Sequence, residues 1–188
     1  MRAKPMTALM TALAALLALA AAAHAVGTEP NAVGLWQATD EESGQPTGWF
    51  LIKDHDGFYD GIIAKMFLQP GQDPSVACVQ CRDDRHDKPW LGLEIIRGMK
   101  QEGLKYEDGS ILDPRDGNVY SAMMTLTPDG QTLVVRGYLG ISLLGRNQYW
   151  KRLPDSAYSQ LDPTINPKHA ARARKPEPAS KPENSARR

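Results

Sequence analysis

Cys78 and Cys81 form the motif with the most obvious chemistry in this sequence of 188 residues. Two cysteines at this spacing form a short disulfide, act as a redox pair, or bind a metal as thiolates. A thioredoxin-like pair owes its low thiol pKa to the N-terminus of a helix, but residues 82–87 show no helical pattern. We therefore predict a structural disulfide that staples an irregular loop, as expected in an oxidising compartment.

Metal binding is the other alternative for these cysteines, with His86 and an aspartate completing the ligand set. The spacing does not match a standard zinc pattern, and the surrounding acids are typical of a solvated loop. Haem attachment requires a histidine directly after the second cysteine, where this chain has Arg82. We predict no metal and no cofactor.

Two other segments resemble functional motifs but depart from them at decisive positions. Residues 140–145 have their second glycine one residue too late for a nucleophile elbow, and no helical stretch follows. Residues 54–57 begin like a calcium loop, but Tyr59 stands where that loop requires glycine. We predict that both are turns, and no catalytic constellation in the chain supports an enzymatic activity.

Five side chains near the C-terminal half of the chain are candidates for ligand binding: Tyr120, Met124, Arg136, Tyr138 and Arg146. Strand alternation places Tyr120 with Met124 on one face, and Arg136 with Tyr138 on one face of the next strand. If Arg136 pointed inward, it would need an anionic partner, which a ligand carboxylate would supply. The alternatives are that Arg136 pairs with an internal acid or faces water.

Short apolar runs punctuated by turn residues predict the architecture that must carry these side chains. Five Asp-Gly pairs occur, and most of them fall between strand-length runs, as in hairpin turns. In residues 69–88 the apolar side chains follow neither the helical nor the strand period, so this segment is predicted to form a long loop over one end of the barrel. About eight strands result, so we predict an all-β, antiparallel up-and-down barrel whose interior is filled or holds one small ligand.

The two ends of the chain differ from this body. Residues 1–25 have the layout of a signal peptide, with cleavage after Ala25, which predicts a periplasmic or secreted protein without a transmembrane segment. Residues 26–32 are predicted to be a loose leader and residues 33–155 the barrel domain. Residues 156–188 are rich in Ala, Pro and basic residues, and are predicted to be a disordered tail.

The zero net charge hides a partition along the chain. Residues 26–162 carry a charge of −7, whereas residues 163–188 carry +5. A nucleic-acid reader would show a basic face on the folded domain itself, so no nucleic-acid partner is predicted. The basic tail either extends freely into solvent or contacts anionic envelope polymers or the acidic body.

The chain also resembles a known family. Gly34-x-Trp36 with Arg152 is similar to the lipocalin-type arrangement, in which a basic side chain of the last strand covers an aromatic at the closed end of a barrel. The chain also resembles the family known as domain of unknown function 2147. The resemblance lies in four segments: Ile111-Leu112-Asp113-Pro114, Gly117-x-x-Tyr120, Leu133-x-Val135-Arg136-Gly137-Tyr138 and Leu144-Gly145-Arg146-x-x-x-Trp150-x-Arg152. The resemblance implies an exported bacterial, lipocalin-like β-barrel with no assigned activity.

Two functional hypotheses follow from these observations. The first is an exported binding module that holds a small, partly apolar and possibly anionic or lipid-like ligand in the barrel. The second is a structural or interaction protein of the cell envelope with a filled core, working through its loops. An enclosed cavity favours the first, whereas exposed apolar surface around Trp49 or Trp90 favours the second.

Overall fold

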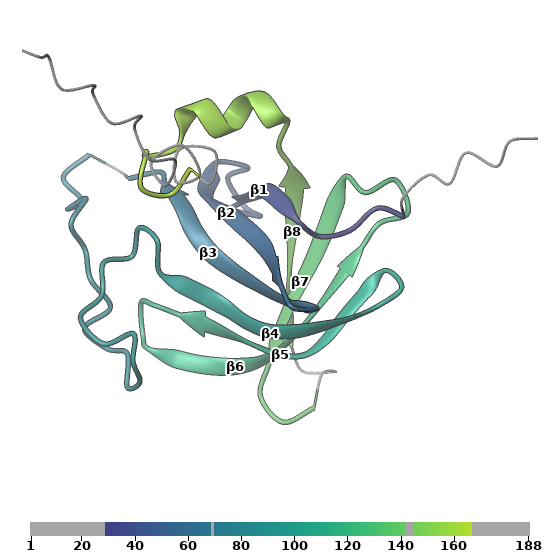
Figure 1. The fold of residues 1–188 in the computed structure, drawn as a ribbon. Helices are drawn as coiled ribbons and strands as arrows, with labels where there is room; N and C mark the ends of the chain where they lie inside the picture. Colours follow the sequence, from purple (N-terminus) through teal and green to yellow (C-terminus); the bar gives the residue numbers. More distant parts are fainter. Residues whose placement is uncertain (1–28, 69, 142–144, 167–188) are drawn as a thin grey trace, which may run out of the picture.

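The computed structural model describes residues 29–68, 70–141 and 145–166, which form a closed barrel of eight antiparallel strands (Figure 1). The predicted fold class is confirmed. The predicted signal peptide and most of the predicted basic tail lie outside the described residues. The elements are β1 (Gly34–Thr39), β2 (Pro46–His55), β3 (Phe58–Met66), β4 (Glu94–Glu102), β5 (Lys105–Asp113), β6 (Asn118–Leu126), β7 (Thr132–Tyr138), β8 (Arg146–Arg152) and the 3-10 helix η2 (Asp155–Gln160).

Two of the five Asp-Gly pairs lie inside strands and not at turns. Asp60-Gly61 and Asp108-Gly109 fall where the registers of β3 with β4 and of β5 with β6 shift. A Cβ at Gly109 would lie 2.5 Å from Met99 Sδ, so only glycine lets the neighbouring strand approach this closely. Residues 105–113 therefore form one bent strand, and such bends help a sheet to close.

The barrel interior is filled by large side chains. Phe50 stacks on Trp150, with ring centroids 4.2 Å apart and planes 13° from parallel. Tyr59 meets Tyr106 edge-to-face at 4.7 Å. The fully buried members of the core include Trp36, Ile52, Ile96, Met99, Tyr106, Met124, Leu133, Val135 and Trp150.

We call the end of the barrel where β1 begins and β8 ends the closed end. There the Arg152 guanidinium lies over the indole of Trp36, 4.2 Å from its centroid, and the two residues are paired across β1 and β8. Gly34 has a φ of 137°, and a Cβ there would lie 2.8 Å from Arg152 Nη1. Glycine at this position therefore leaves room for the arginine.

The chain after the barrel departs from the predicted boundary at residue 156. Residues 155–160 form η2, which runs across the top of the view in Figure 1. Ala157 and Leu161 are 5% and 6% exposed and belong to a second apolar cluster with Trp49 on the outside of the barrel. The prediction of a disordered tail from residue 156 was wrong here, because these two apolar side chains cover that outer cluster.

The opposite end, which we call the open end, collects the β1–β2, β3–β4, β5–β6 and β7–β8 connections. The longest is the β3–β4 connection, residues 67–93, which runs down the left side of the view in Figure 1. Apart from one isolated bridge, its described residues form turns, bends and irregular backbone.

Candidate functional site: a hollow at the open end

A short crosslinked hairpin organises the β3–β4 connection. Ala77 and Pro89 form an isolated antiparallel bridge, and the Cys78 N–H donates to the Lys88 carbonyl at 2.9 Å. One step further, the Trp90 N–H donates to the Val76 carbonyl at 2.9 Å. These bonds fix the backbone of Trp90 at the open end.

Cys78 and Cys81 form a disulfide at the tip of this hairpin, with Cα atoms 5.4 Å apart. Both are buried, and the turn packs closely on the β5–β6 hairpin, where a Cβ at Gly117 would lie 1.9 Å from the Gln80 carbonyl oxygen. The disulfide occupies the two thiolates that metal binding would need. His86 Nδ1 lies 2.9 Å from the Cys81 carbonyl oxygen, and no cluster suited to a metal occurs among the described residues.

Arg85 attaches the same loop to the barrel. Its side chain is 3% exposed, and it donates to both carboxylate oxygens of Asp83 and, at 3.1 Å, to the Glu94 carbonyl. The hydrogen bonds from Arg85 lower the pKa of Asp83 to about 2. The loop is thus fastened to β4 by a buried cation whose partner stays ionised over a wide pH range.

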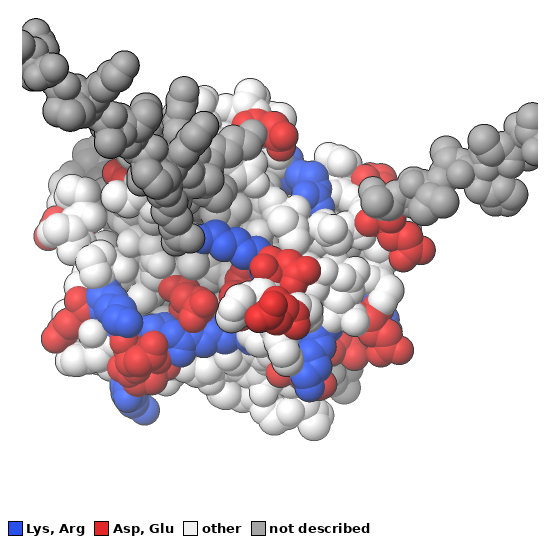
Figure 2. Space-filling model, in the orientation of Figure 1, with Lys and Arg blue, Asp and Glu red and all other residues white. Residues whose placement is uncertain are grey.

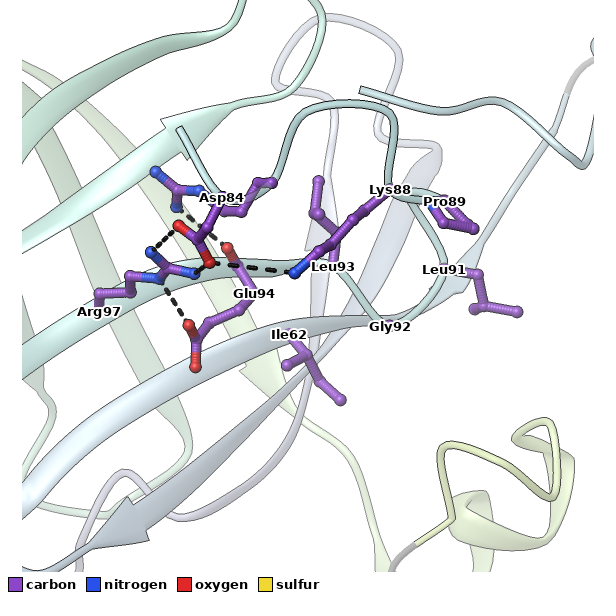
Figure 3. A pocket seen from close by; sticks show the side chains of 10 residues that line it. Ile62, Asp84, Lys88, Pro89, Leu91, Gly92, Leu93, Glu94 and Arg97 are labelled. Atoms are coloured by element: carbon purple, nitrogen blue, oxygen red, sulfur yellow. Dashed lines mark hydrogen bonds and ion pairs between the residues drawn. The ribbon is translucent and has the colours of Figure 1, made fainter. Parts of the chain in front are cut away.

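A first hollow, the charged groove, lies between this loop and β3–β4 and has a volume of about 450 Å³ (Figure 3). Its wall includes Arg97, which binds both carboxylate oxygens of Asp84 at 2.8 and 2.9 Å and reaches Glu94 at 2.5 Å. Lys88 Nζ adds a 4.0 Å contact to Asp84. These charged side chains pair with one another, so the charged groove offers a ligand few unpaired charged groups.

The surrounding surface follows the same pattern. Figure 2 shows basic and acidic side chains interspersed over the face that carries β3 to β5. Lys100 and Asp108, for example, form an ion pair of 3.3 Å between β4 and β5. Opposite charges on this face are therefore largely neutralised by their neighbours.

A second hollow, the mouth hollow, opens between the β1–β2 connection and the β3–β4 connection and has a volume of about 550 Å³. This size is within the range of small-molecule sites. Its apolar lining consists of Pro46, Met66, Phe67, Leu68, Val76 and Trp90, and its polar lining of Asp40, Ser43, Gln45, Thr47, Gln72 and Asp73. It is an apolar trough with a polar rim.

Trp90 contributes an indole to the lining of the mouth hollow. It packs against the barrel core, and its Nε1 is buried with no hydrogen-bond acceptor in the described part of the chain. A buried donor without an acceptor is unfavourable by about 1–3 kcal/mol, so a bound acceptor there would be stabilising.

The five predicted ligand-binding residues do not gather at one site. The register pairs Met124 with Val135 and Met123 with Arg136, so Arg136 and Tyr138 lie on the face opposite to Tyr120 and Met124. Met124 is fully buried on the inner face, whereas Arg136 Nη1 donates to Asn147 at 2.6 Å on the outer face. Of the alternatives for Arg136, the structure therefore does not show the one in which its side chain points into the barrel beside Met124.

Tyr120 and Arg146 lie near the open end. Tyr120 is half-buried on the inner face, and its hydroxyl lies 3.5 Å from Asp116 Oδ2. Arg146 is exposed and pairs with Gly137 at the start of β8. Neither residue lines the mouth hollow.

The residues of the mouth hollow were missed at the sequence level because they come from three separate segments. The sequence indicated Trp90 only as a candidate for exposed apolar surface and did not single out the other lining residues. The one available signal was the crosslink prediction, since the disulfide hairpin holds Trp90 in place. That signal locates the tryptophan but not the opposite wall.

The closed eight-stranded antiparallel sheet defines a lipocalin-like β-barrel protein. A structure search finds the protein HP1028 from the human pathogen Helicobacter pylori, described as belonging to the lipocalin family, with a TM-score of 0.59. The two share 15% identity over 70% of this chain and 90% of that chain, so the likeness concerns the fold alone.

The chain belongs to the bacterial family described as "Uncharacterized protein conserved in bacteria (DUF2147)", whose model matches residues 34–152. This confirms the family resemblance. A search of curated proteins finds no match. Within the described residues, no helix is long and apolar enough to span a bilayer.

Proposed function

We propose that the protein is an exported binding module that takes a small, partly apolar ligand in the mouth hollow. The observation that carries this proposal is the buried, unpaired Nε1–H of Trp90 in a trough of about 550 Å³ at the open end. Lipocalin-like barrels commonly offer one such site at one end. Binding at the rim is supported more strongly than binding within the barrel, because the core side chains are closely packed.

Export is part of the same proposal. The disulfide between Cys78 and Cys81 supports an oxidising compartment, and the N-terminal sequence supports cleavage after Ala25. Fractionation of the native bacterium, followed by N-terminal sequencing of the mature chain, tests it. A cytoplasmic protein that retains its first 25 residues would contradict it.

Titration with the neutral fluorescent probe N-phenyl-1-naphthylamine tests ligand binding. We expect saturable binding, and we expect Trp90→Ala to weaken it about 5- to 10-fold, because an aromatic contact with its buried area is lost. Tyr149→Phe is the matched control, since Tyr149 is an exposed aromatic of β8 outside the mouth hollow. Circular dichroism establishes that both variants fold.

Trp90→Phe separates the two contributions of the indole. Phenylalanine keeps an apolar ring but removes the unpaired donor, so probes without an acceptor should bind it about as well as the wild type. Folded protein that shows no saturable probe binding, or equal binding by Trp90→Ala, would contradict the proposed function.

An interaction protein of the envelope is the second candidate, favoured by the filled core and by apolar residues exposed on loops. Leu139 and Ile141, after β7, are 68% and 62% exposed. Trp49, in contrast, is only 6% exposed beneath η2, so it offers no docking surface. Crosslinking in the native envelope that depends on Leu139 and Ile141, without probe binding at Trp90, would favour this candidate.

A further inference from the structure

The connection between β7 and β8 carries apolar side chains into solvent at the open end, and it reaches the bottom of the view in Figure 1. Leu139 and Ile141 are the two most exposed large apolar residues among those that the structure describes. Val119 is also exposed, on the neighbouring strand β6, two residues before Ser121, which pairs with Tyr138 of β7. The tip of the β7–β8 hairpin is therefore an apolar surface that no described part of the chain covers.

This hairpin differs in charge from the rest of the folded protein. Residues 131–154 contain four basic residues and no acidic one, whereas the remainder of residues 26–162 carries a formal charge of −11. On the neighbouring β5–β6 hairpin, Asp113 pairs with Arg115 at 2.6 Å, so that these two residues and Asp116 together contribute a charge of only −1. An anionic surface would therefore attract the β7–β8 hairpin and repel the rest of the barrel.

Basic and aromatic groups follow the apolar tip along both strands. Arg146 is exposed at the start of β8, and Arg136 lies near the end of β7, where it donates to Asn147 on the outer face. Tyr149 is exposed on the same outer face, because it pairs with Val134 as Asn147 pairs with Arg136. At a membrane interface, apolar side chains lie beneath the headgroups, whereas tyrosine and basic side chains lie at headgroup level. The hairpin has its side chains in this order.

A lipid surface suits this tip better than a protein partner does. A stable protein interface buries about 800 Å² on each partner, whereas a hairpin tip with two apolar side chains offers a small contact. Lipid headgroups move apart around a protruding tip, and anionic headgroups place negative charge beside its arginines. Membrane affinity grows with the apolar area that is buried and with the attraction to anionic lipids, and this hairpin supplies both.

We propose that the β7–β8 hairpin attaches the protein to the surface of a membrane that contains anionic phospholipids. Leu139 and Ile141 insert below the headgroups, and Arg136 and Arg146 lie at the level of the phosphates. The attachment is peripheral and reversible, because two side chains bury far less apolar area than a spanning helix does. This inference goes beyond the proposed function, since it does not depend on a ligand in the mouth hollow.

Flotation with lipid vesicles tests the inference on the protein purified after export, with its basic tail retained. Vesicles of equal parts phosphatidylglycerol and phosphatidylcholine are compared with vesicles of phosphatidylcholine alone. We expect binding to the anionic vesicles and several-fold weaker binding to the neutral ones. High salt should reduce this difference, because it screens the attraction between the arginines and the phosphates.

Variants of the tip then separate apolar insertion from charge attraction. Leu139→Asn and Ile141→Asn should each weaken binding to the anionic vesicles about 5- to 10-fold, because a buried apolar contact is lost. Val79→Asn is the matched control, since Val79 is 61% exposed, almost as much as Ile141, but lies in the β3–β4 connection. Arg146→Gln should weaken binding about 5-fold. Its control is Lys105→Gln, which removes an exposed basic group at the closed end and should leave binding nearly unchanged.

A fluorescent reporter distinguishes the hairpin from residues 163–188, whose charge of +5 also attracts anionic lipids. Ile141→Trp keeps a large apolar side chain at the tip. Its emission should be quenched by phospholipids that carry bromine on their acyl chains, because the inserted indole lies beneath the headgroups. The same measurement on the wild type gives the background from the four natural tryptophans, which are buried or half-buried. Circular dichroism establishes that all variants fold.

The outcomes decide between lipid, tail and protein as the basis of attachment. Quenching at residue 141, together with weaker binding by both asparagine variants, would support the inference. Vesicle binding that both variants leave unchanged, without quenching, would overturn it, because the attraction would then belong to the basic tail. Absence of vesicle binding would also overturn it, and crosslinking to an envelope protein through Leu139 and Ile141 would then assign the tip to a protein partner. Titration with N-phenyl-1-naphthylamine tests the proposed function separately from all of these outcomes.

Discussion

Replacement of Arg152 by lysine tests how the closed end is held together. The arginine donates from Nε to Gly130 O at 2.6 Å, from Nη1 to Val33 O at 2.8 Å and from Nη2 to Asn31 O at 2.5 Å. Lysine keeps the charge, but its single ammonium group reaches one of these carbonyls and cannot lie flat on an indole.

The expected cost follows from these contacts. Two lost hydrogen bonds cost about 2 kcal/mol, because each partly exposed bond of this kind contributes about 1 kcal/mol net. The weaker contact with the ring of Trp36 adds about 0.5–1 kcal/mol. We therefore expect the free energy of unfolding to fall by about 3 kcal/mol and Tm to fall by about 10 °C.

Urea denaturation followed by tryptophan fluorescence measures this change. Lys151→Met is the control, because the neighbouring Lys151 is exposed and donates to Thr132 Oγ1 at 2.9 Å on the outer surface. It should change the free energy of unfolding by less than about 0.5 kcal/mol. If Arg152→Lys were as mild as Lys151→Met, closure of the barrel by this arginine would be refuted.

Three further predictions concern other parts of the structure. Gly109→Ala should lower the free energy of unfolding by about 2–3 kcal/mol, because the added Cβ would meet Met99. Gly44→Ala is the control: the space around Gly44 is open, so it should lower the free energy of unfolding by only about 1 kcal/mol, for the positive φ. Equal urea midpoints for the two variants would contradict this prediction. Replacing both Cys78 and Cys81 by alanine should lower the free energy of unfolding by about 2 kcal/mol, as expected for a disulfide that closes a four-residue loop. Hydrogen-exchange protection should be lost first in the β3–β4 connection, and unchanged protection there would refute the stapling role. Because the pKa of folded Asp83 is lowered to about 2, the stabilisation from its ionised form should be complete above its ordinary pKa of about 4 and be lost as pH falls towards 2. Asp83→Asn should therefore make the urea midpoint depend less on pH between about 4 and 2. The same pH dependence in the variant and the wild type would contradict this prediction.

Much of the barrel was predictable because its signals are local. Asp56-Gly57 and Asp116-Gly117 lie at hairpin turns, where glycine adopts the positive φ that a tight turn requires. The cysteine pair was predictable from spacing and compartment. The Trp36–Arg152 contact was expected only through the family resemblance, since nothing local shows that the first and last strands meet.

The features that were not predictable depend on distant partners. Alternation shows that Arg136 and Tyr138 share a face, but it does not show which face is inside. The register of β6 with β7 decides that question and places Val135 inside instead. Asp108-Gly109 has the sequence of a hairpin turn but lies inside β5, where Met99 of β4 approaches closely, and no local pattern reveals that approach.

The four tryptophans show where this barrel leaves its hydrogen bonding incomplete. The indole N–H groups of Trp36, Trp49 and Trp150 donate to Ala32 O, Gln37 Oε1 and Gln148 Oε1 at 2.8, 3.0 and 3.0 Å. Trp90 alone has no acceptor among the described residues, although the hairpin with the disulfide fixes its backbone. Since natural folds satisfy buried donors almost everywhere, this exception is the observation on which the proposed ligand site rests.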